Sequence, residues 1–323
     1  MHASTFLLSP RALRERFVDR ATAKFARNVP DFVRLQALVA AQGGRFLNDH
    51  GAIRTADPAV AALFVRAARV LGLQRERGYA FPAKKLVSFD LQVIGDDARQ
   101  FKVFVSEVDL AAFPPAVATL IREDCATQSA AVDHGAFIAL IAKAEAQGGL
   151  NEADAEAFIA HFVDVLMARN GPPMQRATLD AVAVVSGEAA SALALGPDFN
   201  HVTIDVPSAG FGGIEAMTAA MLAAGFTMLP AIQGAPGTKL RQTATMAATM
   251  ATPVLEADGS VGNAQSEKQF VEIIERAQAV DADGALLWAD DGSPLIFRNF
   301  LAANAEKIFD AASTRGSGAA TSC

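Results

Sequence analysis

The sequence predicts an α+β fold made of a duplicated module. Two observations support this prediction: an order of strand, helix, strand and strand occurs in each half of the chain, and apolar residues recur at every second position in some segments and at every third or fourth in others. Since a domain has roughly 100–200 residues, a chain of 323 residues forms one large domain or two ordinary ones. We expect a single domain over residues 1–314 and a disordered tail over 315–323.

The first half of the chain is expected to begin with a long helix. Leu13, Phe17 and Phe25 recur at helical spacing, and two glycines end the pattern at 43–44. The period then changes to two, which indicates strands, and the glycine and aspartates at 95–97 indicate a hairpin. The elements predicted in this half are, in order, a helix over 11–43, an extended run over 46–55, a helix over 58–71, and strands over 86–93 and 101–108.

The second half is expected to contain a helical insertion and then to return to strands. Residues 114–195 are rich in alanine and other helix formers and are interrupted by glycine and proline pairs. Around residue 272 the pattern alone favours an amphipathic helix, with Glu272 and Glu275 facing water and large apolar residues inside. The other elements predicted here are a strand over 201–206, a helix over 213–224, and strands over 238–245, 250–256 and 286–295.

The composition excludes several classes of protein. Hydrophobic residues make up 51% of the chain and charged residues 20%, which is typical of a globular protein and rules out a largely disordered one. The net charge of −7, without a basic run, argues against a nucleic-acid partner. Two cysteines are too few for a disulfide framework, and neither a signal peptide nor an apolar run of about 18 residues is recognisable. We therefore expect a cytoplasmic protein without a membrane partner.

Two histidines begin extended runs and are the first candidates for chemistry. Because alternate side chains of a strand share a face, His50 and Arg54 point the same way, with the small Ala52 between them. An imidazole and a guanidinium on one face suit an anionic ligand. His201 likewise shares a face with Thr203. The alternative for either histidine is a hydrogen-bonded residue at a strand edge.

Glu272 is the third candidate. A carboxylate among large apolar residues is costly to bury unless a cation, a proton or hydrogen-bond donors compensate it. Two histidines and one carboxylate are the set with which non-haem Fe(II) oxygenases fill one face of an octahedral metal, leaving the other face open for substrate and O₂. Such a site favours an anionic bidentate ligand, for example a 2-oxo acid.

Six segments of the chain, two of which contain His50 and His201, resemble segments of a known family. They are, in chain order, residues 48–55 (NDHGAIRT), 81–86 (FPAKKL), 104–107 (FVSE), 200–203 (NHVT), 240–243 (LRQT) and 304–309 (NAEKIF). Together they resemble the 2-oxoadipate dioxygenase/decarboxylase family, long catalogued as a domain of unknown function. That family includes the bacterial enzyme that makes 2-hydroxyglutarate in D-lysine breakdown. The resemblance extends from about residue 12 to residue 314.

The resemblance implies a vicinal-oxygen-chelate-like core, in which βαβββ modules form a curved sheet that cups a metal and additional helices wrap around it. It implies that residues 1–314 are one metal-dependent catalytic domain. By position, His50, His201 and Glu272 match the family's metal ligands, which places Glu272 on a strand, and Arg54 matches the arginine that grips a substrate carboxylate. The neighbours that are candidates for orienting the imidazoles are Asn48, Asp49 and Asn200.

Three further residues are expected near the substrate. Lys84 and Arg241 would add positive potential around an acidic substrate, with a solvated surface cation as the alternative for each. Asn304 lies in a segment where longer members of the family have Phe-Leu-Pro-Val-Ser-Ala and this chain has Phe-Leu-Ala-Ala-Asn-Ala at 300–305. A hydroxyl group is lost and an amide is gained there, so we expect the far end of the substrate to differ from that of the longer members.

The implied activity is an Fe(II)-dependent conversion of a 2-oxo dicarboxylate, such as 2-oxoadipate, to a 2-hydroxy acid, such as 2-hydroxyglutarate, with O₂ uptake and CO₂ release. Zn²⁺ or Ni²⁺ can replace iron in a purified sample. Two alternatives stay open: a glyoxalase-like lyase or metal-assisted hydrolase with a redox-inert metal, and a non-catalytic relative that binds a ligand or a partner protein. The sequence defines neither the substrate's chain length and stereochemistry nor the oligomeric state.

Overall fold

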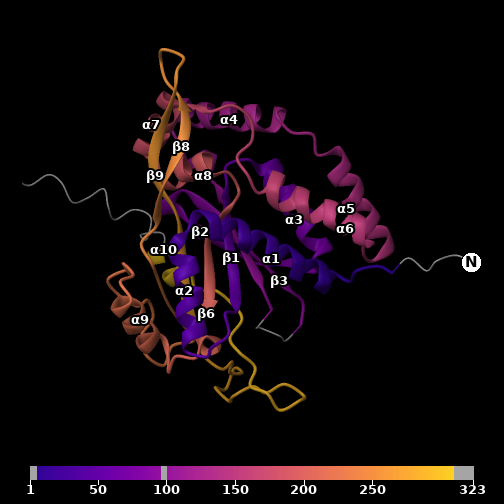
Figure 1. The fold of residues 1–323 in the computed structure, drawn as a ribbon, viewed down its shortest axis with the longest axis vertical. Coiled ribbons are helices and arrows are strands. Elements are labelled where there is room, and N and C mark those ends of the chain that lie inside the picture. Colours follow the sequence, from indigo (N-terminus) through magenta and orange to yellow (C-terminus); the bar gives the residue numbers. More distant parts are fainter. Residues whose placement is uncertain (1–5, 96–99, 309–323) are drawn as a thin grey trace, which may run out of the picture.

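The computed structural model describes residues 6–95 and 100–308 as two similar modules separated by a run of helices (Figure 1). The first module consists of β1 (Asn48–Thr55), α3 (Pro58–Val70), β2 (Leu73–Phe81), β3 (Leu86–Val93) and β4 (Lys102–Val108). The second consists of β6 (Phe199–Asp205), α9 (Ile214–Ala223), β7 (Leu240–Ala244), β8 (Ala248–Leu255) and β9 (Val261–Arg276). Each module therefore has the βαβββ order, as predicted.

The two modules form one curved sheet in which their first strands lie side by side. β1 and β6 are antiparallel, β4 runs parallel to β1, and β9 runs parallel to β6. The order of the strands is β2-β3-β4-β1-β6-β9-β8-β5, where β5 (Met174–Gln175) is a short edge strand and β7 also pairs with β9. This pairing relates one module to the other by an approximate two-fold axis between β1 and β6.

Helices bury one face of this sheet. Ile53, Val202 and Ile273 point from β1, β6 and β9 into a core that also contains Phe17 and Phe64. The helices outside the modules are α1 (Pro10–Asn28), α2 (Pro30–Ala41), α4 (Pro115–Ala130), α5 (Gly135–Gln147), α6 (Glu152–Ala160) with a π-helical turn (His161–Leu166), α7 (Arg176–Val185), α8 (Gly187–Leu195) and α10 (Ala302–Ile308). None of the helices in the described residues is both long and apolar enough to cross a membrane.

Several predicted elements differ from the structure, and the causes are local. The helix predicted over 11–43 is two helices, because Pro30 has no N–H to donate and Val29 before it is not helical. β2 was not predicted, since charged, exposed residues at 75–77 interrupt its period. Residues 286–295 form only isolated bridges instead of a strand. The strands of the predicted hairpin are confirmed as β3 and β4, whereas part of its turn and the tail over 315–323 lie outside the described residues.

The helix that the local pattern favours around Glu272 is wrong. The segment is the C-terminal half of β9, which pairs with β6 on one side and β7 on the other. Because both faces of this strand are covered, Val271 and Ile273 face the helical core while Phe270 and Ile274 lie on the opposite face, and the alternation of polar and apolar residues is lost. The strand placement implied by the family resemblance is the correct one.

Candidate metal centre

Three polar side chains meet on the face of the sheet opposite the helical core. His50 comes from β1, His201 from β6 and Glu272 from β9, and all three are buried. One potential ligand atom from each residue lies within 4.8 Å of the other two. Glu272 Oε2 is 3.2 Å from His201 Nε2 and 3.6 Å from His50 Nε2. The structure thus brings together the three residues predicted as metal ligands.

A β-bulge lets Asp49 support His50. Asn48 pairs with Ile204 of β6, and His50 pairs with the adjacent residue Thr203. Asp49 is therefore an extra residue in β1 without a partner in β6, which defines a β-bulge. Neighbouring side chains of a regular strand point to opposite faces, but here Asp49 Oδ1 lies 2.8 Å from His50 Nδ1. This contact leaves Nε2 directed at Glu272, which is the arrangement of a metal-binding imidazole held by a carboxylate.

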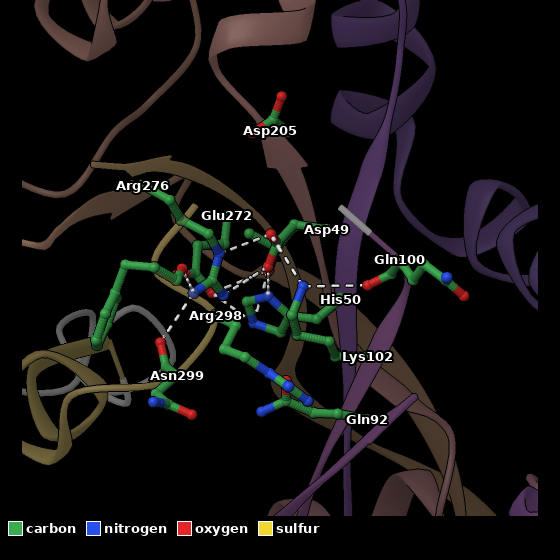
Figure 2. Close-up of polar contacts among 12 residues, drawn as sticks. Asp49, His50, Gln92, Gln100, Lys102, Asp205, Glu272, Arg276, Arg298 and Asn299 are labelled. Atoms are coloured by element: carbon green, nitrogen blue, oxygen red, sulfur yellow. Dashed lines mark hydrogen bonds and ion pairs between the residues drawn. The ribbon is translucent and has the colours of Figure 1, made fainter. Parts of the chain in front are cut away.

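Asp49 is itself held in a buried charge cluster (Figure 2). Arg276 donates from Nε and Nη2 to the two carboxylate oxygens of Asp49, at 2.7 and 2.8 Å, and Lys102 Nζ lies 3.7 Å from Oδ2. Burial alone would raise the pKa of Asp49, but the charges of Arg276 and Lys102 hold that pKa well below its usual range. The same burial lowers the pKa of Lys102 to about 8. Asp49 is therefore a carboxylate whenever the protein is folded at neutral pH.

The two candidate histidines have different surroundings. Burial opposes the charged form of His50, but hydrogen bonds to Asp49 and Glu272 raise its pKa overall. Burial, followed by the positive charges of His50 and Arg54, lowers the pKa of His201 well below its ordinary value. The ring of His201 stacks on Phe270, with centroids 4.8 Å apart. His201 is consequently neutral at physiological pH, the form in which imidazole binds a metal.

The donor set fits a divalent metal ion. Thr203 donates its hydroxyl hydrogen to Glu272 Oε2 over 3.0 Å, and the other groups near this carboxylate are the two imidazoles. Among the described residues, no lysine or arginine forms an ion pair with Glu272. A cation, a proton or hydrogen-bond donors can compensate a buried carboxylate, and a divalent metal would supply the cation here. Two imidazole nitrogens and one carboxylate oxygen supply the ligands of the facial set that binds Fe(II), and Zn²⁺ uses the same residue types.

A cavity of about 350 Å³, including its open part, adjoins the three candidate ligands. Its remaining wall is mostly apolar and consists of Phe104, Gln242, Phe300, Leu301, Ala305 and Ile308. The ring of Phe300 packs 4.8 Å from that of His50, and Arg276 donates to the carbonyl of Asn299 just before it, at 2.8 Å. Arg276 therefore links the segment that closes the cavity to the carboxylate that holds His50.

The other predicted site residues lie outside this wall. Arg54 Nη1 forms an ion pair of 2.6 Å with Glu188 on α8. Arg241 on β7 forms ion pairs with Glu215 and Glu275, and since Gln242 lines the cavity, the alternation of the strand turns Arg241 to the opposite face.

Lys84 and Asn304 also lie away from the cavity wall. Lys84 is half-buried in a 3₁₀ turn after β2. Asn304 donates its amide hydrogen to the carbonyl of Leu240 and so ties α10 to β7. Lys84, Arg241 and Asn304 do not line the cavity beside the candidate ligands, and their place near the substrate stays a prediction.

Three charged residues at the site were not singled out from the sequence: Arg276, Lys102 and Glu188. Each is buried, and buried charges are rare unless they are paired. The signal available for Lys102 was its place inside an apolar strand, at 101–105. Arg276 ends β9 and Glu188 lies in the first turn of α8. Both positions are ordinary for charged surface residues, so nothing in the sequence points to either.

The fold and the site define a class of protein: an α+β protein in which paired βαβββ modules cup three potential metal ligands on a curved sheet. Within that class, the chain belongs to the 2-oxoadipate dioxygenase/decarboxylase family, whose model matches residues 17–292. This membership confirms the predicted family and makes the protein one of a family of enzymes. No curated protein matches the chain.

Solved structures share the fold. A glyoxalase-superfamily protein from Ralstonia eutropha JMP134 is 22% identical, with a TM-score of 0.73 over 84% of each chain. The hydroxyglutarate synthase of Oryza sativa in complex with 2-oxoadipate is 18% identical, with a TM-score of 0.68 over 98% of this chain and 99% of the other. The hydroxyglutarate synthase of Pseudomonas putida in complex with 2-oxoadipate is 22% identical, with a TM-score of 0.68 over 86% of this chain and 67% of the other.

Proposed function

We propose that the protein is an Fe(II)-dependent dioxygenase and decarboxylase that acts on 2-oxoadipate or a 2-oxo dicarboxylate of similar length. The observation that carries this proposal is the convergence of one potential ligand atom from each of His50, His201 and Glu272 within 4.8 Å, beside a mostly apolar cavity. Family membership and the two related structures that contain 2-oxoadipate support the choice of substrate.

The overall reaction balances without a further reductant. 2-Oxoadipate and O₂ give 2-hydroxyglutarate and CO₂, so that one oxygen atom enters the new carboxylate and the other the new hydroxyl group. Bound Fe(II) would supply the open coordination positions and the redox chemistry that this conversion needs. No organic substrate besides the 2-oxo dicarboxylate is required, and the cavity has to hold one small anion together with O₂.

The chain's own residues have separate roles in this proposal. His50, His201 and Glu272 would hold the metal, and the cavity that they line would receive the substrate. Asp49 keeps the Nδ1 proton of His50 in place, so that Nε2 is always the ligand atom. Phe104 and Phe300 keep water from the reacting carbons. Arg54 is assigned to the second carboxylate of the substrate.

The test is oxygen consumption and CO₂ release by protein loaded with Fe(II) without air and then given 2-oxoadipate. We expect one CO₂ for each O₂, loss of both signals in His50→Ala, and normal signals in His134→Ala. The second variant is a matched control, because His134 is bonded to His161 and lies outside the cavity wall. Iron-loaded protein that consumes no O₂ with 2-oxo acids of several lengths would contradict the proposal and favour a lyase or hydrolase with a redox-inert metal.

A further inference from the structure

The ion pair between Arg54 and Glu188 places a second carboxylate beside the candidate active site. Arg54 Nη1 and Glu188 Oε2 are 2.6 Å apart, and the two side chains are only 8% and 11% exposed. Glu188 is contributed by α8, a helix that packs against both β1 and β9, the strands of His50 and Glu272. The pair is therefore buried between α8 and β1 and is not a surface contact.

Arg54 lies on the face of β1 that carries the candidate ligand His50. It is four residues beyond His50 on the same strand face, which corresponds to about 13 Å along the strand between the two backbones. Between them lies Ala52, which is small and buried. A molecule bound to the metal by its 2-oxo acid end would extend its chain toward this guanidinium.

A substrate's second carboxylate would meet an arginine that already has an anionic partner. One guanidinium cannot neutralise two buried carboxylates, and two like charges in a low-dielectric site repel each other strongly. Glu188 stands in the first turn of α8, where the free N–H groups and the helix dipole favour a negative charge. Its carboxylate thus retains a favourable environment when Arg54 turns to another anion.

We propose that Glu188 is a specificity-determining residue: it holds Arg54 while the cavity is empty and is exchanged for the second carboxylate of a bound 2-oxo dicarboxylate. This inference rests on the proposed function. Its consequence is that the attraction between Arg54 and the substrate is offset by the loss of the internal pair. The chain then discriminates less between 2-oxo acids with and without a second carboxylate than a free arginine would.

The test compares the binding of two acids that differ only at the far end, 2-oxoadipate and 2-oxohexanoate. Dissociation constants are measured by calorimetry without air, on protein loaded with Zn²⁺ so that no turnover occurs. We expect Glu188→Gln to lower the dissociation constant of 2-oxoadipate by about tenfold, because an amide competes less well than a carboxylate for the guanidinium of Arg54. The affinity for 2-oxohexanoate should stay within about twofold.

The matched control is Glu215→Gln, which removes a carboxylate from Arg241 on the other face of the sheet and should leave the ratio of the two constants unchanged. Circular dichroism and melting temperature establish that both variants are folded. If Glu188→Gln leaves the ratio of the two dissociation constants unchanged, or weakens the binding of 2-oxoadipate relative to that of 2-oxohexanoate, the proposed exchange of Glu188 for the substrate carboxylate is wrong. The proposed function would still stand. If neither acid binds to zinc-loaded protein, the proposed function fails and the exchange fails with it.

Discussion

Replacing Asp49 with asparagine should weaken both metal binding and the fold, and the two effects can be separated. Asp49 is 4% exposed and receives two hydrogen bonds from Arg276 and one from His50. The asparagine amide keeps the volume but removes the charge. It leaves the Arg276 guanidinium buried without its counterion, which costs about 3–5 kcal/mol of unfolding free energy. It also replaces the charged acceptor that fixes the His50 tautomer with a neutral amide, which lowers metal affinity by about 10–100-fold, or about 1.4–2.8 kcal/mol.

The assay measures the affinity of Zn²⁺ by competition with a chromophoric chelator, at a temperature where the variant is fully folded by circular dichroism. Urea denaturation of the metal-free protein gives the change in unfolding free energy separately. The matched control is Asp198→Asn. Asp198 is also 4% exposed and forms an ion pair of 2.8 Å with Lys24, but it does not contact a candidate ligand. The control should therefore lose stability and keep its affinity for Zn²⁺. Equal affinities in the two folded variants would refute the positioning role of Asp49.

Three further predictions concern stability. Burial lowers the pKa of Lys102 from 10.5 to about 8, so between these two pH values the unfolded chain binds more protons than the folded protein. The unfolding free energy should therefore rise with pH in that window, and urea titrations of Lys102→Met should show no such rise. A Cβ atom at Gly51 would lie 2.5 Å from the Phe199 ring, so Gly51→Ala should lower the unfolding free energy by about 1–3 kcal/mol, and an unchanged denaturation midpoint would contradict the packing. Burial lowers the pKa values of His134 and His161 below 6.5, so stability should fall as pH falls below about 6.5, and His161→Phe should show a flatter melting-temperature profile than wild type between about pH 5 and 7.

The sequence predicts the parts of the site that depend on strand periodicity. His50 and Arg54 share a face of β1, and His201 and Thr203 share a face of β6, because side chains alternate in any strand. The same rule fails for Asp49, whose side chain joins that of His50 only because of the bulge. A bulge depends on how two strands pair, and the pairing partner is remote in the sequence.

Contacts between residues far apart in the chain are the parts of the site that the sequence does not predict. Arg276 and Asp49 are 227 residues apart in the chain, and nothing near either residue indicates the other. Glu272 was misplaced by its local pattern because β9 is covered on both faces, a property of the assembled sheet. Only the family resemblance gave its strand placement, because it carries information on the whole fold. Arg241 was expected beside the substrate on charge alone, and its actual partners, Glu215 and Glu275, are again set by packing.

The duplication of the module means that every inward position occurs twice. In strand register, His50 lies opposite Lys102 and His201 lies opposite Phe270, and two residues further on Ala52 faces Phe104 while Thr203 faces Glu272. Superposing one module on the other therefore places Phe104 on the counterpart of Glu272. Of the four positions that correspond in this way, His50, His201 and Glu272 carry potential metal ligands and the fourth carries the ring of Phe104. The two modules are therefore unequal at the site, and the side without a potential ligand is a wall of the cavity.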